Sequence, residues 1–263
     1  MDHVDVGGRR IAFRRAGTGP PVLLVHGAMA DSRDWHHQLE AFAPPFTTIA
    51  WDAPGCGGSA DLPAGYDLDQ LVEDLDGFRR ALRITGAHVI GHSLGSILSI
   101  AFQARHPDAV RSLVLASAYA GWAGSLPPSE VDRRVTLALA DLDRPAADAA
   151  RDMVATLLPA DAPAALVDEQ VAMVSQARPA TTRAMVERFA RVDLRPALPG
   201  ITAPTLLLYG RDDVRAPPWV ADALHAAIPG SRLVLLPGVG HSGHVQAPDQ
   251  WNRVVLEFLD GQS

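Results

Sequence analysis

The residues best suited to chemistry lie in the run GHSLG at positions 91–95. An apolar run, residues 87–90, precedes it, and a stretch with helical periodicity follows it. A serine at a strand-to-helix turn, with glycine two residues to either side, is the pattern of an exposed nucleophile. The turn strains the serine backbone, and only small side chains fit two residues away. We therefore predict that Ser93 is a nucleophile and that Leu94, in the first helical turn, offers a free backbone N–H group.

A serine hydroxyl needs a base within hydrogen-bond reach and a third group that orients the base. Two later segments supply such groups: Asp212-Asp213 follows an apolar run at 205–209, and His241 follows another at 232–236. Each group comes after a different predicted strand, so a parallel sheet would bring all three to the same edge. We predict His241 as the base, with one of the two aspartates as the acid.

The rest of the chain predicts the scaffold that these groups require. Residues 4–15 indicate an edge hairpin that turns at Gly7-Gly8. The uninterrupted apolar run at 22–25 indicates a parallel strand buried on both faces, and further strands are predicted at 47–51, 87–90, 112–117, 205–209 and 232–236. Helical patterns alternate with them. Alternating strands and helices predict an α/β fold with helices on both faces of the sheet.

Residues 121–195 differ from the rest of the chain. They contain no strand-like run, and their prolines divide them into roughly four short helices. Their Ala, Asp and Pro content also suits a disordered segment, but periodic apolar positions such as Met153, Val154, Leu157 and Leu158 favour packed helices. We therefore predict a core at 1–120 and 196–263, interrupted by a helical cap at 121–195.

Composition excludes several classes of function. The formal net charge of the 263 residues is -7, which argues against nucleic-acid binding. All 23 basic residues are arginine, so Schiff-base chemistry and a P-loop, which need lysine, are excluded. No apolar run approaches membrane-spanning length, and the N-terminal residues lack an apolar signal segment. We expect a cytoplasmic protein with no membrane partner, and the sequence leaves its oligomeric state open.

Together these motifs resemble those of the α/β-hydrolase superfamily, from about residue 9 to residue 260. The matching segments are His26-Gly27, DAPGCGGS at 52–59, GHSLG, GRDDVRAP at 210–217 and GHSGHVQAP at 240–248. The resemblance implies a mostly parallel sheet of about eight strands with an inserted cap, and a serine hydrolase that uses no cofactor. The family spacing selects Asp213, three residues after a glycine and four before a proline, with Asp212 as the alternative. The family's Gly-His pair selects His241 over His244.

The resemblance also implies an oxyanion hole and a substrate class. The second backbone donor, beside Leu94, maps to Ala28, with Met29 as a weaker candidate. Candidate pocket residues are Met29, Trp35, His92 and Trp122, although core packing explains the tryptophans equally well. We expect a small-molecule ester or lactone as substrate, and residues 178–217 are similar in layout to enol-lactonases. The same triad also serves carbon–carbon bond hydrolysis, thioester cleavage and cofactor-free peroxidation, and some similar proteins are small-ligand receptors.

Three other patterns favour structural roles. The run GCGGSA at 55–60 fits a dinucleotide-binding loop, but a proline and a glycine prevent the helix that must follow at once. His36-His37 and His241 with His244 are candidate metal pairs, but no third ligand accompanies them at metal-site spacing, so we expect no metal. Cys56 has no histidine or lysine beside it in sequence, which favours a structural thiol.

Overall fold

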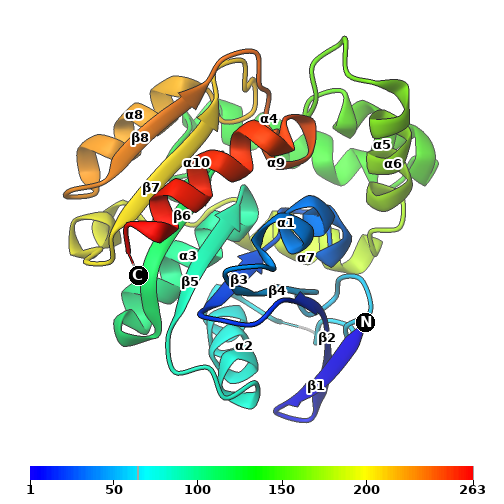
Figure 1. Cartoon of the computed structure of the whole chain (residues 1–263). Helices are drawn as coiled ribbons and strands as arrows, with labels where there is room; N and C mark the ends of the chain where they lie inside the picture. The colour runs from blue at the N-terminus through cyan, green and yellow to red at the C-terminus, as the bar shows by residue number, and fades with distance from the viewer. Residues whose placement is uncertain (64, 263) are drawn as a thin grey trace.

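A computed structural model describes residues 1–63 and 65–262 of the chain. Within them lies one sheet, whose strands are β1 (Asp2–Val6), β2 (Arg9–Ala16), β3 (Pro21–Val25), β4 (Thr47–Trp51), β5 (Ala87–His92), β6 (Val110–Ala116), β7 (Thr205–Gly210) and β8 (Arg232–Leu236). Their order is β1-β2-β4-β3-β5-β6-β7-β8, so the hairpin forms one edge and β8 the other (Figure 1). Only the β1–β2 and β2–β4 pairings are antiparallel. The expected mostly parallel sheet of about eight strands is confirmed.

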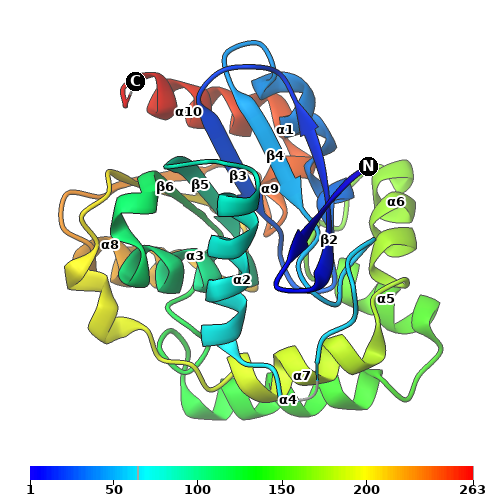
Figure 2. The same ribbon diagram turned by 90° about the horizontal axis from the view of Figure 1, so that it is seen from below.

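Helices cover both faces of the sheet (Figure 2). One face carries α2 (Leu68–Ala81), α3 (Leu94–Arg105) and α8 (Pro218–Ala227), and the other carries α1 (His36–Phe42) and α10 (Pro248–Asp260). Successive strand residues point to opposite faces. In β3, Leu23 and Val25 belong to the core beneath α2 and α3, whereas Val22 and Leu24 belong to the core beneath α1 and α10. Strand β3 is therefore buried on both faces, as its uninterrupted apolar run predicts.

Four helices lie between β6 and β7: α4 (Pro128–Asp141), α5 (Ala146–Val154), α6 (Ala164–Val174) and α7 (Pro179–Phe189). In Figure 2, α4 and α7 lie side by side along one margin of the molecule, and α5 and α6 lie along the adjacent margin. Helices α4 and α7 join the main core through Val131 and Met185. Helices α5 and α6 share a small core of their own, made of Ala150, Val154, Leu158, Val171 and Val174, to which Val245 is added. The predicted core segments include residues 64 and 263, which lie outside the described residues.

Short elements complete the chain. They are η1 (Ser32–Trp35), η2 (Pro107–Ala109), η3 (Arg195–Gly200) and α9 (Gly243–Gln246). Helix α2 begins at a capping box, in which Asp67 accepts from the backbone N–H of Gln70 and the Gln70 side chain accepts from the backbone N–H of Asp67. Among the described helices, none combines the length and apolar character needed to cross a membrane.

Candidate active site

Ser93 lies at the turn between β5 and α3, where its backbone adopts a left-handed conformation with φ 51° and ψ -115°. The flanking glycines leave no room for a side chain. A Cβ on Gly95 would lie 2.2 Å from the carbonyl oxygen of Val25, and one on Gly91 would lie 2.4 Å from Ser99 Oγ. The backbone N–H of Ser93 donates to the last carbonyl of β6 at 2.9 Å. Positive φ in a residue other than glycine is unfavourable, so the surrounding structure must hold this turn.

Asp213 and His241 form a buried pair. Asp213 follows β7 and His241 follows β8, and the imidazole Nδ1 lies 2.9 and 3.0 Å from the two carboxylate oxygens. Oδ1 of this carboxylate also accepts the backbone N–H groups of Arg215 and Ala216, both at 2.8 Å. Asp212 is exposed, and its side chain has no hydrogen bond to any described residue. The fold therefore brings Asp213, and not Asp212, to the imidazole.

The contacts of Asp213 keep its carboxyl group ionised. Burial alone would raise its pKa, but the charge of His241 and its hydrogen bond outweigh burial and hold the pKa below its ordinary value. The carboxylate thereby holds the imidazole proton on Nδ1, which leaves Nε2 as the free nitrogen. Nε2 of His241 is buried and has no hydrogen-bond partner among the described residues.

Ser93 and His241 line the same cavity, of about 50 Å³, which we call the small chamber. No hydrogen bond joins Ser93 to Nε2 of His241 in this structure. Catalytic hydrogen bonds often tighten only when substrate is bound. The small chamber therefore holds an unpartnered imidazole nitrogen and a strained serine, the two groups that acyl transfer to a serine requires.

The predicted oxyanion donors, Ala28 and Leu94, also line the small chamber. Leu94 is the first residue of α3, so its N–H group has no partner within the helix. Ala28 lies in the loop after β3, which His26 holds in place. The Nε2 atom of His26 accepts from the backbone N–H of Ala53 at 3.0 Å, and its Nδ1–H donates to the carbonyl oxygen of Gly27 at 2.8 Å. His26 thus ties the loop after β3 to the loop after β4.

The small chamber adjoins a larger cavity of about 630 Å³, which we call the large chamber. Helices α4, α5 and α7 supply much of its mostly apolar wall. Six residues line both chambers: Ala28, Leu94, Trp122, Met153, Val174 and Arg215. The two chambers are therefore neighbours, and the inserted helices enclose the space next to Ser93.

The predicted pocket residues occupy different places. Trp122 lines both chambers, Met29 lines the large chamber and His92 lines the small one. Trp35 lines neither chamber. It is fully buried, and its ring packs against His244, with centroids 4.6 Å apart, and against Trp251, with centroids 6.0 Å apart. The structure therefore places Trp35 in the core behind the site, which corrects the pocket assignment.

A second buried carboxylate and histidine pair lies beside the nucleophile. His244 Nε2 donates to Asp34 Oδ2 at 2.9 Å, and the rings of His244 and His92 lie 4.5 Å apart. His92 Nε2 in turn donates to the carbonyl oxygen of His241 at 3.1 Å. Burial alone would raise the pKa of Asp34, but the charge and hydrogen bond of His244 lower it to about 2. His92 thus supports the backbone of the predicted base, and His244 of the buried pair packs against the His92 ring.

The same cluster has the composition of a metal site. Asp34, His92 and His244 offer ligand atoms within 4.8 Å of one another, although the sequence indicated no third ligand. Asp34 is 210 residues from His244, and no local pattern points to it. In this structure Asp34 bonds to His244 and to Gln170, and His92 bonds to the main chain. Nδ1 of each of the two histidines has no hydrogen-bond partner among the described residues.

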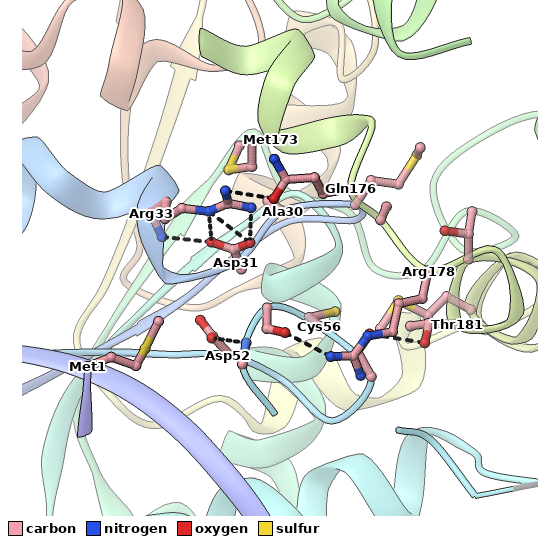
Figure 3. A pocket seen from close by; sticks show the side chains of 17 residues that line it. Met1, Ala30, Asp31, Arg33, Asp52, Cys56, Met173, Gln176, Arg178 and Thr181 are labelled. Carbon is pink, nitrogen blue, oxygen red and sulfur yellow. Dashed lines mark hydrogen bonds and ion pairs between the residues drawn. The ribbon is translucent and has the colours of Figure 1, made fainter. Parts of the chain in front are cut away.

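A further pocket, of about 250 Å³, is lined by the loops after β3 and β4 and by residues of α6 and α7 (Figure 3). Its arginines are paired with acids: Arg33 with Asp31 at 2.7 Å and Arg178 with Asp61 at 2.8 Å. Burial raises the pKa of Cys56, which also lines this pocket, to about 12, so its thiol is not ionised at neutral pH. Neither Ser93 nor His241 lines this pocket.

Comparison with known proteins adds a family match and similar relatives. Residues 20–248 match the family model described as alpha/beta hydrolase fold. A relative from Pseudomonas savastanoi pv. phaseolicola, whose name, carbamate hydrolase RutD, is provisional, is 30% identical over 251 residues, which cover 93% of this chain and 95% of the relative. The pimeloyl-[acyl-carrier protein] methyl ester esterase of Nitrosomonas europaea is 29% identical, with 92% of this chain and 96% of that protein covered.

A solved structure shows the same fold. The thermophilic esterase from Thermogutta terrifontis, determined with malate bound, superposes with a TM-score of 0.90 and 27% identity. The match covers 99% of this chain and 98% of that one.

Proposed function

The chain belongs to the alpha/beta hydrolase fold family, and on that premise we propose that it is a serine hydrolase that cleaves a small carboxylic ester or lactone. One observation carries the proposal: the buried Asp213–His241 pair leaves Nε2 of the imidazole free in the chamber that Ser93 lines. The esterase names among the relatives support the same reaction class.

In the proposed first step, His241 Nε2 takes the hydroxyl proton of Ser93 while Oγ bonds to the carbonyl carbon of the ester. The carbonyl oxygen becomes an oxyanion, which accepts hydrogen bonds from the backbone N–H groups of Ala28 and Leu94. The bond between the carbonyl carbon and the alkoxy oxygen then breaks, and the alcohol leaves with the proton from His241. Asp213 stabilises the imidazolium that exists between these events.

Water completes the cycle. It gives a proton to His241 while its oxygen bonds to the acyl carbon, and the bond from that carbon to Ser93 Oγ then breaks. Ser93 recovers its proton from the imidazolium, and the carboxylic acid is released. The reaction consumes one ester and one water and yields one acid and one alcohol; a lactone yields both groups on one molecule.

The inserted helices act as a cap in this proposal. Helices α4, α5 and α7 line the large chamber, so substrate groups that extend beyond the scissile bond contact them. The mostly apolar wall favours an organic acyl or alcohol group over a highly polar one. Because the similar esterase holds malate, a panel of test substrates should include carboxylate-bearing esters beside neutral esters, lactones and thioesters.

The test is hydrolysis of p-nitrophenyl acetate and butyrate by the wild type and by Ser93→Ala. The variant should lose at least about a thousandfold in kcat. Ser231→Ala, in a turn outside both chambers, is the matched control and should stay within about twofold of the wild type. A Ser93→Ala variant that keeps full activity would refute the proposal. A single slow turnover, with strong thermal stabilisation by the ligand, would favour a small-ligand receptor instead.

A further inference from the structure

Arg215 occupies the boundary between the two chambers. It lies two residues after Asp213 in sequence, and it lines both the small chamber, with Ser93, and the large chamber. Its guanidinium donates from one nitrogen to Thr156 Oγ1 at 2.9 Å and to Met153 Sδ at 3.4 Å. Both acceptors are uncharged, so the positive charge of Arg215 has no ion-pair partner among the described residues.

The other arginines around the large chamber all lie within ion-pair distance of a carboxylate. Arg133 and Arg134 both pair with Glu130, at 2.8 and 2.7 Å. Arg144 pairs with two aspartates, at 2.7 and 2.6 Å. The arginines of the pocket in Figure 3 are paired as well. Arg215 is therefore the one arginine lining these cavities whose guanidinium lies beyond ion-pair distance of every carboxylate in the described part of the chain.

The nearest acids of the site are engaged elsewhere. Asp213 accepts from His241 and from two backbone N–H groups, one of which is the main chain of Arg215 and not its guanidinium. Asp34, in the wall of the small chamber, accepts from His244 and from Gln170. Burial is the largest cause that lowers the pKa of Arg215, as expected for a cation partly removed from water. Arginine nevertheless stays charged in proteins, and a half-buried charge without an acid partner is costly.

We infer that Arg215 binds an anionic group of the substrate, so that the preferred substrates are esters or lactones that also carry a carboxylate. This inference rests on the proposed hydrolase function. The carboxylate would lie at the junction of the chambers while the scissile carbonyl lies at Ser93. A guanidinium can hold a carboxylate by two parallel hydrogen bonds, which gives orientation as well as affinity.

The experiment compares two methyl esters by pH-stat titration of the acid released. In monomethyl glutarate, a carboxylate takes the place of the terminal ethyl group of methyl hexanoate. The measured quantity is the ratio of kcat/KM for the charged ester to kcat/KM for the neutral ester. Replacement of Arg215 by Met should lower this ratio by about 10- to 100-fold, mainly through KM, because the contact exists in the ground state as well as in the transition state.

Matched variants separate this role from a general effect of the substitution. Arg215→Lys, which keeps the charge but loses the bidentate geometry, should lower the ratio less than Arg215→Met. Arg144→Met removes a paired arginine from the wall of the same chamber and should leave the ratio within about threefold. Circular dichroism and thermal melting show whether each variant is folded.

The outcomes distinguish the inference from the proposed function. If Ser93→Ala abolishes hydrolysis of both esters but Arg215→Met leaves the ratio unchanged, the anion site is refuted and the hydrolase function stands. If Ser93→Ala hydrolyses both esters normally, the proposed function itself fails. If Arg215→Met does not fold, inhibition of the wild type decides: glutarate should compete with methyl hexanoate more strongly than glutaramide does, and equal inhibition overturns the inference.

Discussion

Replacing Asp213 by asparagine keeps the size of the side chain and removes its charge. The structure predicts how the amide would be oriented. Oδ1 of Asp213 accepts the backbone N–H groups of Arg215 and Ala216, both at 2.8 Å, so the amide oxygen must take that position. The amide NH₂ then faces Nδ1 of His241, where Oδ2 lies at 2.9 Å in the wild type. An NH₂ group only donates, so Nδ1 must become an acceptor and the imidazole proton must move to Nε2.

In that tautomer His241 cannot take the proton of Ser93. We expect kcat to fall by about 10⁴-fold, because a serine hydrolase with the wrong histidine tautomer loses its base. At 1.36 kcal/mol for each factor of ten, this is about 5 kcal/mol of transition-state stabilisation. The matched control is Asp212→Asn, since Asp212 is exposed and its side chain makes no hydrogen bond to the described residues. Its kcat should change by less than about twofold.

The assay is hydrolysis of p-nitrophenyl butyrate, with the melting temperature of each variant as the check on folding. Proton NMR of the imidazole N–H resonances reports the tautomer directly. The reasoning is wrong if Asp213→Asn keeps more than a tenth of the wild-type kcat, or if Asp212→Asn loses as much activity as Asp213→Asn.

Two predictions concern stability. A Gly95→Ala methyl group would lie 2.2 Å from the backbone oxygen of Val25, so urea titration should show a loss of about 1–3 kcal/mol in the free energy of unfolding. Gly200→Ala meets nothing within 4 Å and is the control; equal losses would contradict the steric explanation. The folded-state pKa of Asp34, about 2, lies below its ordinary 3.8, so its ionised form contributes about 2 kcal/mol above about pH 4, and this contribution is lost as the pH falls towards 2. Asp34→Asn should therefore be less stable than the wild type at neutral pH, and the difference should shrink towards pH 2; a difference independent of pH would exclude this linkage.

The sequence predicts elements and local turns well because their causes are local. The strands appear as apolar runs. The two glycines of GHSLG stand at the positions where a Cβ would collide with neighbouring atoms. The strand order β2-β4-β3-β5 is harder to predict from the sequence, because apolar runs of similar composition do not specify which strand pairs with which. The expected alternation of strands and helices gives a mostly parallel sheet, but the register depends on packing between distant segments.

Parts of the candidate site depend on contacts that no local pattern contains. Asp212 and Asp213 are identical in chemistry, and only the geometry of the loop after β7 places one of them beside His241. The Asp34–His244 bond joins residues 210 positions apart. The sequence does not show that Arg215 lacks an ion-pair partner, because this depends on which acid lies beside each arginine around the chambers. For Trp35 the predicted place in the pocket is wrong, because the sequence does not distinguish an aromatic side chain in the pocket wall from one in the core.

The separate packing of α5 and α6 has a consequence for how such a protein diversifies. Their apolar side chains contact mostly one another, and the main body contributes Val245 and the partly buried Met29 to that cluster. Substitutions within this helical pair can therefore reshape the roof above the bound molecule without disturbing the layers that fold around the sheet. Selection for a new substrate can act on this pair while the proposed catalytic residues beneath it stay intact.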